Sequence, residues 1–229
     1  MTDTAAPARI ETVVLDMAGT TVRDDGMVEA AFALAWDRKQ GADRADEAMQ
    51  WVRDTMGQSK IDVFRHLVSE EDAQALNLEF EAAFDELVAA GRAVAIPGAE
   101  AAIRALQAEG RTVVLTTGFS RPTAEAILAA LGWSSLADAV LTPADAGRGR
   151  PAPDLNLLAV MRSRASSVAA LAVVGDTESD IASAIAAGAG LSVGVLTGSR
   201  TEAQFAAAGA DRVLASVAEL PDLLARLGR

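Results

Sequence analysis

The sequence contains no cysteine and a single histidine, His66, in 229 residues. Without cysteine the chain can form no disulfide framework, no thiolate metal site and no cysteine nucleophile. No apolar run is long enough to span a bilayer, and the first residues lack the basic and apolar segments of a secretion signal. We therefore expect a cytoplasmic protein without membrane contact, whose residues 1–10 form a loose leader.

Positive charge is scarce, because 20 lysines and arginines face 32 acidic residues and leave a formal net charge of −12. This excess argues against nucleic acid as a partner, since phosphate backbones are bound by clustered basic side chains. Solubility alone explains an acidic surface. A small anionic ligand would need a local positive pocket, which a divalent cation, Arg150, Lys60 and backbone amides could supply.

A run of β-branched and apolar residues, 12–15, predicts a buried strand that ends at Asp16. In open α/β sheets, ligands bind at the carboxyl ends of strands, toward which helix N-termini point their positive ends. Gly19 would let backbone amides approach an anion closely, and Thr20 and Thr21 add hydroxyl groups. The same pattern also fits an aspartate that only caps its own turn.

The segment after this motif has a different character from the rest of the chain. From residue 27 to about residue 95, apolar side chains recur at helical spacings and no strand-like run occurs. Breaks between roughly four helices are expected at Gly41, Gly57 and Gly91. We therefore predict a helical cap domain over residues 24–95, inserted into a core of residues 1–23 and 96–229.

Strands and helices alternate through the second part of the core. Strands are expected at residues 112–117, 139–141, 171–174, 192–196 and 212–214. Helices are expected at residues 99–110, 122–131, 154–164, 178–187 and 202–208, with a last one at the C-terminus. This alternation predicts an α/β fold with a doubly wound parallel sheet and helices on both faces.

Polar residues follow the later strands as well. Thr117 and Gly118 follow the second strand, where a hydroxyl and an N–H group can bind phosphoryl oxygens, with Thr116 as the alternative. Asp176 follows another strand, and Asp180 lies one helical turn further. Without a function, these residues would form an ordinary turn and a helix cap with an exposed acid.

Together these segments resemble the haloacid dehalogenase superfamily of hydrolases over nearly the whole chain. The resemblance implies that Asp16 attacks phosphorus and forms an aspartyl-phosphate. A Mg²⁺ ion would neutralise the charge between Asp16, Asp176 and the ligand. In the family, the backbone carbonyl at the position of Ala18 completes the metal site, and Asp180 would hold the metal, a water or Arg150.

Three departures from most of the superfamily resemble phosphonoacetaldehyde hydrolase (phosphonatase) and its relatives. These are an alanine at the second acidic position, an arginine where most members carry lysine, and a Met-Gly-x-x-Lys segment: Ala18, Arg150, and Met56, Gly57 and Lys60. The resemblance implies that Lys60 forms an imine with a carbonyl group β to phosphorus, and that Met56 and Gly57 bind the substrate. A lysine on a helix is otherwise simply solvated.

The resemblance also distinguishes between neighbouring candidates. Thr117 rather than Thr116 matches the family's Thr-Thr-Gly, and Arg150 rather than Arg148 precedes the matching proline. Thr117 would then bind phosphoryl oxygens, while Arg150 would hold both these oxygens and the carboxylate of Asp16.

Two positions restrict the chemistry. Ala18 cannot exchange a proton, so the hydrolysis of phosphate esters would lose the rate enhancement of roughly 10²–10⁴-fold that general acid–base catalysis provides. Val63 stands where phosphonatase has a histidine thought to move protons during imine chemistry, which favours another 2-oxoalkylphosphonate over phosphonoacetaldehyde. His66 lies on a different part of the helix surface, and we interpret it as a structural or surface residue.

We therefore predict a Mg²⁺-dependent hydrolase that cleaves the C–P bond of a 2-oxoalkylphosphonate beneath a mobile cap. The alternatives are a phosphatase for a small phosphorylated metabolite, in which Lys60 only binds anions, and a non-enzymatic phosphate sensor. By resemblance to the family, we also expect a homodimer formed through exposed apolar positions of the first cap helix, around Phe32 and Trp36.

Overall fold

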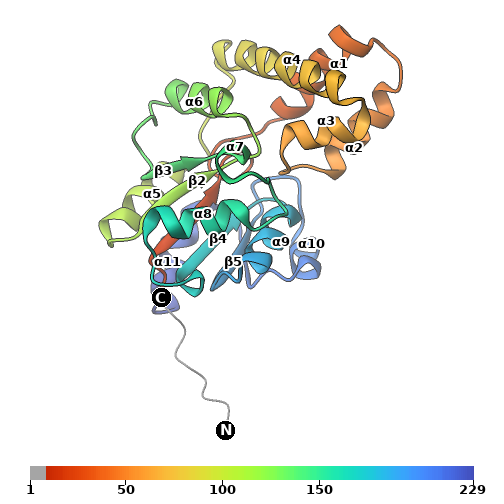
Figure 1. Cartoon of the computed structure of the whole chain (residues 1–229). Helices are drawn as coiled ribbons and strands as arrows, with labels where there is room; N and C mark the ends of the chain where they lie inside the picture. Colours follow the sequence, from red (N-terminus) through yellow and green to blue (C-terminus); the bar gives the residue numbers. More distant parts are fainter. Residues whose placement is uncertain (1–8) are drawn as a thin grey trace.

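The computed structural model describes residues 9–229, so the expected leader over residues 1–10 lies almost entirely outside the described residues. Ile10, at the end of that leader, is fully buried in the core. No helix within the described range is long and apolar enough to cross a bilayer. Figure 1 shows a core built on one sheet, with the helices from the first part of the chain grouped to one side of it.

The core sheet has six parallel strands in the order β3-β2-β1-β4-β5-β6. Their bounds are β1 Thr12–Asp16, β2 Thr112–Thr116, β3 Ala139–Leu141, β4 Leu171–Gly175, β5 Leu191–Val195 and β6 Arg212–Leu214. This order confirms the predicted doubly wound sheet. Because the chain proceeds in opposite directions on the two sides of β1, the carboxyl ends of β1 and β4 border the crevice where such sheets bind ligands.

Helices cover both faces of this sheet. They are α5 Ala99–Ala108, α6 Arg121–Ala130, α7 Pro143–Ala146, α8 Asp154–Ser163, α9 Glu178–Ala187, α10 Glu202–Ala208 and α11 Leu220–Arg226. Val14 of β1 packs in a cluster with Leu155 of α8, whereas Val13 and Leu15 belong to the larger cluster that contains Ile103 of α5. Burial on both faces explains why this strand is apolar at successive positions.

Some strand ends differ from the sequence prediction by a single residue. The strand β2 ends at Thr116, so Thr117 is the first residue of the following loop. The strand β5 begins at the buried Leu191 and ends at Val195, and the next residue, Leu196, is 39% exposed. The short helix α7 was not predicted, since a single turn has no helical periodicity to detect.

The cap contains four helices, as predicted: α1 Met27–Gln40, α2 Ala45–Asp54, α3 Lys60–Leu67 and α4 Glu70–Ala89. The break between α3 and α4 falls at Val68 and Ser69 and not at a glycine. There the Ser69 hydroxyl accepts a hydrogen bond from the backbone N–H of Asp72 at 3.2 Å and caps α4. Stacked and edge-on contacts join Phe32, Phe64 and Phe80 into an aromatic core of the cap.

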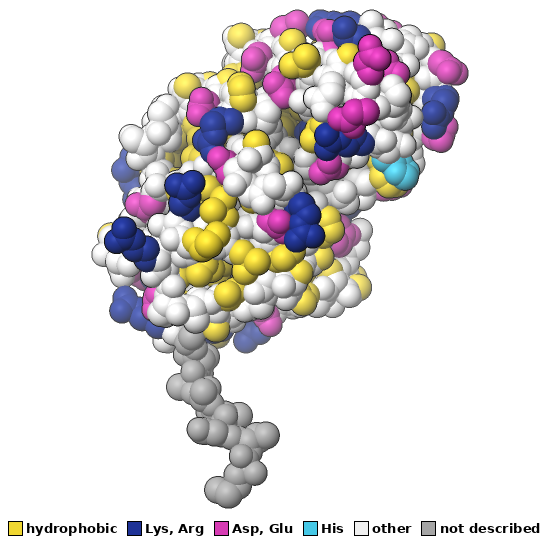
Figure 2. Space-filling view, viewed as in Figure 1, with side chains coloured by type: hydrophobic (Ala, Val, Ile, Leu, Met, Phe, Trp, Pro, Cys, Tyr) yellow, Lys and Arg dark blue, Asp and Glu magenta, His cyan; other side chains and the backbone are white. Residues whose placement is uncertain are grey.

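The two aromatic residues expected around an exposed dimer surface lie inside the cap, so that expected exposure is wrong; the homodimer itself stays a prediction. Phe32 is 2% exposed and Trp36 is 3% exposed. The ring of Phe32 stacks on Phe64 of α3, and the indole N–H of Trp36 donates to the backbone carbonyl of Asp43 at 2.9 Å. Figure 2 shows acidic and basic side chains intermixed over the visible face of the cap.

The two chain segments that connect core and cap lie side by side. The N–H of Arg23 donates to the carbonyl of Val94 at 2.8 Å, and the N–H of Ile96 donates to the carbonyl of Thr21 at 2.9 Å. This pairing anchors both ends of the cap beside the loop that follows Asp16, so any movement of the cap starts next to the predicted nucleophile.

Candidate active site

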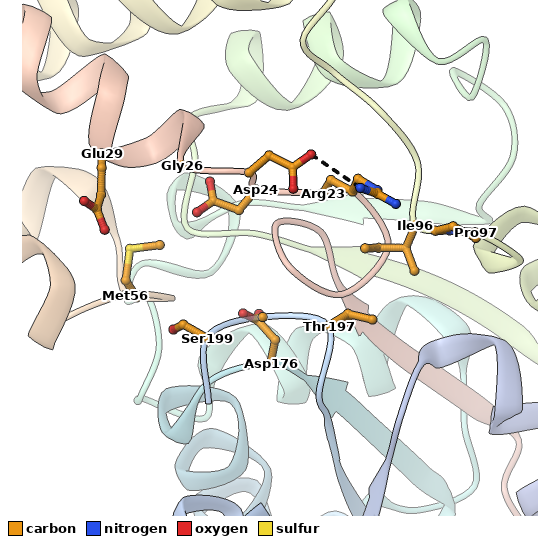
Figure 3. A pocket seen from close by; sticks show the side chains of 12 residues that line it. Arg23, Asp24, Gly26, Glu29, Met56, Ile96, Pro97, Asp176, Thr197 and Ser199 are labelled. Atoms are coloured by element: carbon orange, nitrogen blue, oxygen red, sulfur yellow. Dashed lines mark ion pairs between the residues drawn. The ribbon is translucent and has the colours of Figure 1, made fainter. Parts of the chain in front are cut away.

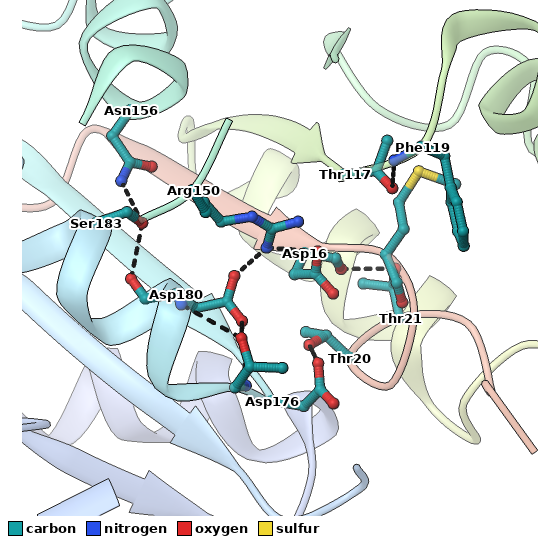
Figure 4. Close-up of polar contacts among 12 residues, drawn as sticks. Asp16, Thr20, Thr21, Thr117, Phe119, Arg150, Asn156, Asp176, Asp180 and Ser183 are labelled. Atoms are coloured by element: carbon teal, nitrogen blue, oxygen red, sulfur yellow. Dashed lines mark hydrogen bonds and ion pairs between the residues drawn. The ribbon is translucent and has the colours of Figure 1, made fainter. Parts of the chain in front are cut away.

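Asp16 is the last residue of β1, and its carboxylate contacts a buried guanidinium. The Nη1 atom of Arg150 lies 2.6 Å from Oδ1 of Asp16 and also contacts the carboxylate of Asp180 (Figure 4). All three side chains are at least 95% buried. Arg148, the alternative considered from the sequence, instead pairs with Asp154 at 2.8 Å on the surface.

Asp180 positions this arginine. It is the third residue of α9, where its carboxylate accepts hydrogen bonds from the N–H and hydroxyl of Thr177, at 3.1 and 2.6 Å. The Thr177 hydroxyl in turn accepts a hydrogen bond from the N–H of Asp180, at 3.4 Å, which completes a capping box at the start of the helix. Both carboxylate oxygens of Asp180 are engaged by Thr177 and Arg150, so Asp180 orients Arg150 and is not needed as a metal ligand.

The site carries more negative than positive charge. Burial raises the pKa of Asp16 to about 7, although the Arg150 guanidinium opposes the effect. Burial, and then the charges of Asp16 and Asp180, hold the pKa of Asp176 well above its usual range. The carboxylate of Asp176 accepts a hydrogen bond from the hydroxyl of Thr20 at 3.4 Å, a long contact that brings no positive charge.

This charge imbalance fits a divalent cation. Among residues 9–229, no three acidic or histidine side chains converge on one point, so the chain itself would supply two carboxylates, Asp16 and Asp176. Mg²⁺ commonly binds in this way, with one or two carboxylates and the remaining positions taken by carbonyl oxygens, waters or substrate. The backbone carbonyl of Ala18, two residues beyond Asp16 in the same loop, is the candidate third ligand from the chain.

Thr117 and Gly118 lie in the loop after β2, next to the loop that follows Asp16 on the neighbouring strand β1. Both residues line a small cavity together with Asp16 and Arg150, whereas Thr116 does not line it. The Thr117 hydroxyl accepts a hydrogen bond from the N–H of Phe119 at 3.1 Å, which leaves its own proton free to donate to a ligand. Thr20, by contrast, does not line the cavity.

The cap reaches into the core at residues 57–59, between α2 and α3. A methyl group on Gly118 would collide with the carbonyl oxygen of Gln58, and one on Gly149 would lie 2.7 Å from Cβ of Ser59. Gly57 has a φ of +84°, and a methyl group there would lie 2.5 Å from the hydroxyl oxygen of Thr177. Glycine is therefore required on both sides of the contact for the cap to close this tightly.

Lys60 begins α3 directly after this contact. Its backbone N–H donates to the carbonyl of Gly118 at 3.2 Å, and its side chain is 7% exposed. It lines the same cavity as Asp16, with its Nζ atom 5.7 Å from the centroid of the Phe119 ring. Burial lowers the pKa of Lys60 to about 8, although the charge of Asp24 opposes the effect. A substantial fraction of the amine is therefore neutral near pH 8.

The enclosed cavity has a volume of about 30 Å³, enough for only a few water molecules. A larger pocket of about 500 Å³ lies beside it and shares three lining residues with it, Asp24, Met56 and Asp176. Figure 3 shows Asp24 and Asp176 on opposite sides of this pocket, with Met56 reaching in from the cap. The larger pocket therefore adjoins the enclosed site.

The site has no histidine that could transfer protons, because the family's histidine position is Val63 and the single histidine lies elsewhere. Val63 is 3% exposed and packs in the cap core. His66 lies on the cap surface and stacks on Trp51, with ring centroids 3.8 Å apart. Reasoning from the sequence missed Asp24 and Phe119, which both line the cavity beside Lys60. The signal for Phe119 was its position directly after Thr117-Gly118.

Comparisons with known proteins agree with this geometry. Residues 10–188 match the haloacid dehalogenase-like hydrolase family. A phosphonoacetaldehyde hydrolase of Bacillus cereus is 32% identical over 83% of this chain and 77% of that protein. A bifunctional phosphonoacetaldehyde hydrolase/aminoethylphosphonate transaminase of Clostridioides difficile is 26% identical over 96% of this chain, which spans 40% of that protein.

A structural comparison agrees with this family at the level of the fold. The crystal structure of a hydrolase from Pseudomonas syringae matches with a TM-score of 0.83 and 25% identity, over 94% of this chain and 98% of that one. This chain therefore belongs to the haloacid dehalogenase-like hydrolases and is phosphonatase-like in sequence.

Proposed function

We propose that this hydrolase cleaves the C–P bond of a 2-oxoalkylphosphonate. The observation that carries the proposal is the buried amine of Lys60, which shares one cavity with Asp16 where Ala18 leaves no acid for a leaving alkoxide. An ordinary ester phosphatase has little use for a lysine whose pKa is lowered to about 8 by burial. An imine-forming enzyme needs one, because only the neutral amine attacks a carbonyl group.

In this mechanism the core side chains act on the phosphoryl group. A carboxylate oxygen of Asp16 attacks phosphorus and forms an aspartyl-phosphate that water later hydrolyses. Arg150, Thr117 and the N–H of Gly118 hold the phosphoryl oxygens and stabilise the charge that develops on them. A bound Mg²⁺ at Asp16, Asp176 and the Ala18 carbonyl would supply further charge neutralisation.

The cap side chain acts on carbon. The amine of Lys60 condenses with the ketone or aldehyde carbon, water leaves, and a protonated imine remains. When Asp16 bonds to phosphorus, the electron pair of the C–P bond forms a C=C bond, and the C=N π electrons move to nitrogen and give a neutral enamine. The carbon leaving group therefore never becomes a bare carbanion.

The closed cavity is too small for such a substrate, so the cap must open to admit it. Met56 and Gly57 lie in the loop that contacts the core, and this loop would move with Lys60. Each turnover then includes opening and closing of the cap, and these steps could limit the rate.

Reductive trapping tests the proposal. Sodium borohydride added during turnover of 2-oxopropylphosphonate or phosphonoacetaldehyde is expected to leave a stable secondary amine on Lys60, located by peptide mass spectrometry. The only other lysine, Lys39, is 41% exposed and provides an internal control for non-specific reductive alkylation. Phosphate release without any adduct on Lys60 would refute the imine.

A second function is favoured by Val63, which leaves imine chemistry without the family's histidine. In that case the protein is a phosphatase for a small phosphorylated metabolite, and Lys60 only binds anions. Lys60→Ala separates the two functions, because loss of an anion contact mainly raises KM, whereas loss of the imine abolishes kcat. Assays of inorganic phosphate released from a panel of oxoalkylphosphonates and phosphate monoesters measure both constants.

A further inference from the structure

Imine formation requires proton transfers, and the cavity offers few groups that can perform them. Asp16 is paired with Arg150, and Asp176 faces the proposed metal site. Arg150 does not give up its proton at accessible pH. The one remaining carboxyl group that lines the cavity around Lys60 is Asp24.

Asp24 lies where the chain leaves the core for the cap. Its carboxylate oxygen Oδ1 accepts a hydrogen bond from the backbone N–H of Val28 at 3.1 Å, in the first turn of α1. The residue lines the enclosed cavity of Lys60, and it also lines the larger pocket, which Figure 3 shows. Asp24 therefore borders both the cavity that holds the buried amine and the pocket that opens to solvent.

The charges around both groups favour proton exchange between them. Burial raises the pKa of Asp24 above its usual value, the charge of Lys60 opposes this effect, and the nearby acids Glu29 and Asp25 add to it. Four groups act on Lys60: Asp24, Arg150, Asp16 and Asp176. Burial moves the pKa of the acid up and that of the amine down, so the free energy of moving a proton between them becomes smaller.

We propose that Asp24 is the proton-transfer residue for the Lys60 imine, in place of the histidine absent at Val63. The proposal rests on the function proposed above. The Asp24 carboxylate first takes a proton from the Lys60 ammonium. The amine lone pair then forms a C–N bond to the substrate carbonyl, whose π electrons move to oxygen, and a proton passes from nitrogen to that oxygen.

The carboxylic acid of Asp24 next returns its proton to the hydroxyl group of this carbinolamine. The C–O bond breaks, water leaves, and the nitrogen lone pair forms the C=N bond of the protonated imine. Asp24 is again a carboxylate beside a cation, so the proton count is balanced over the step. The reverse sequence releases the ketone or aldehyde product after the enamine carbon is protonated.

The test is Asp24→Asn, with Asp25→Asn as the matched control. Asparagine keeps a side-chain oxygen that can accept the hydrogen bond from Val28, so the start of α1 is retained. Asp25 is exposed, and its ion pair with Arg23 is 3.8 Å long on the surface. We measure the rate at which the borohydride-trapped Lys60 adduct appears after rapid mixing, as a function of pH.

Asp24→Asn is expected to slow adduct formation by about 100-fold or more, in the range of general acid–base catalysis, and to change its pH profile. Asp25→Asn is expected to stay within about twofold of wild type. Equal adduct rates and pH profiles in Asp24→Asn and wild type would overturn the role of Asp24 alone. An absence of any Lys60 adduct in the wild type would overturn the imine itself, which keeps the two failures distinguishable.

Discussion

Replacement of Lys60 by methionine tests how strongly the fold suppresses the charge of this amine. Lys60 is 7% exposed, so folding at neutral pH moves a cation out of water into a nearly closed cavity. Methionine has a similar length and no charge to desolvate. We therefore expect Lys60→Met to be more stable than wild type at pH 7, although it should be inactive.

The magnitude follows from the two pKa values of Lys60, the usual 10.5 and about 8 in the folded chain. Below pH 8 both states bind the proton, and the stability difference between variant and wild type is constant. Between pH 8 and 10.5 only the unfolded chain binds it, so wild-type stability rises by about 1.4 kcal/mol per pH unit. The advantage of Lys60→Met should therefore shrink by about 3 kcal/mol across this interval.

Urea unfolding followed by circular dichroism, at intervals from pH 7 to pH 10.5, measures this change. The composition makes the experiment clean, because the chain has no cysteine, no tyrosine and only one other lysine, Lys39. Lys39→Met is the matched control at an exposed site, with an expected effect within about 0.5 kcal/mol. If the stability difference between Lys60→Met and wild type is the same at pH 7 and pH 10.5, the pKa of Lys60 is not lowered in the folded chain.

Other predictions concern activity. Asp16→Asn should release no inorganic phosphate above background, and measurable release would exclude Asp16 as the nucleophile. Arg150→Lys should lower kcat by about 10-fold or more in a phosphate-release assay, since lysine cannot reproduce a planar guanidinium contact; unchanged kcat would contradict this role. Gly118→Ala should prevent full closure and lower kcat, because its methyl group would meet the carbonyl of Gln58; wild-type turnover would show that closure is not needed. The rate of Lys60 trapping should rise with pH and level off above about pH 8, and a flat profile would count against a neutral amine.

The fold class could be predicted from the sequence because it depends on local patterns. Short β-branched runs between amphipathic segments predict a parallel sheet wherever they occur. The ends of the elements depend on contacts with other parts of the chain, and here the prediction was less accurate. The cap helix α4 begins after Ser69 because the Ser69 side chain caps it. The strand β5 begins one residue early, at Leu191, which is buried in the core.

The burial of Phe32 and Trp36 was missed for a related reason. The spacing of Phe32 and Trp36 correctly indicates an apolar helix face, but periodicity does not say what covers that face. In the folded chain α3 and α4 cover it, with Phe64 and Phe80 in the same aromatic cluster. Asp24 was missed because an acid in a short polar turn before a helix needs no functional explanation. Its carboxylate accepts a hydrogen bond from the N–H of Val28.

The sequence by itself determined the residue types of the site, since Asp16, Lys60, Arg150 and Asp176 could be identified from motifs and their order in the chain. The tertiary structure alone decided that Lys60 shares a closed cavity with Asp16 and that its pKa lies near 8. The physical reason is that burial is a property of the whole packing. The amine is buried where residues 57–59 pack against Gly118 and Gly149, which are distant in the chain.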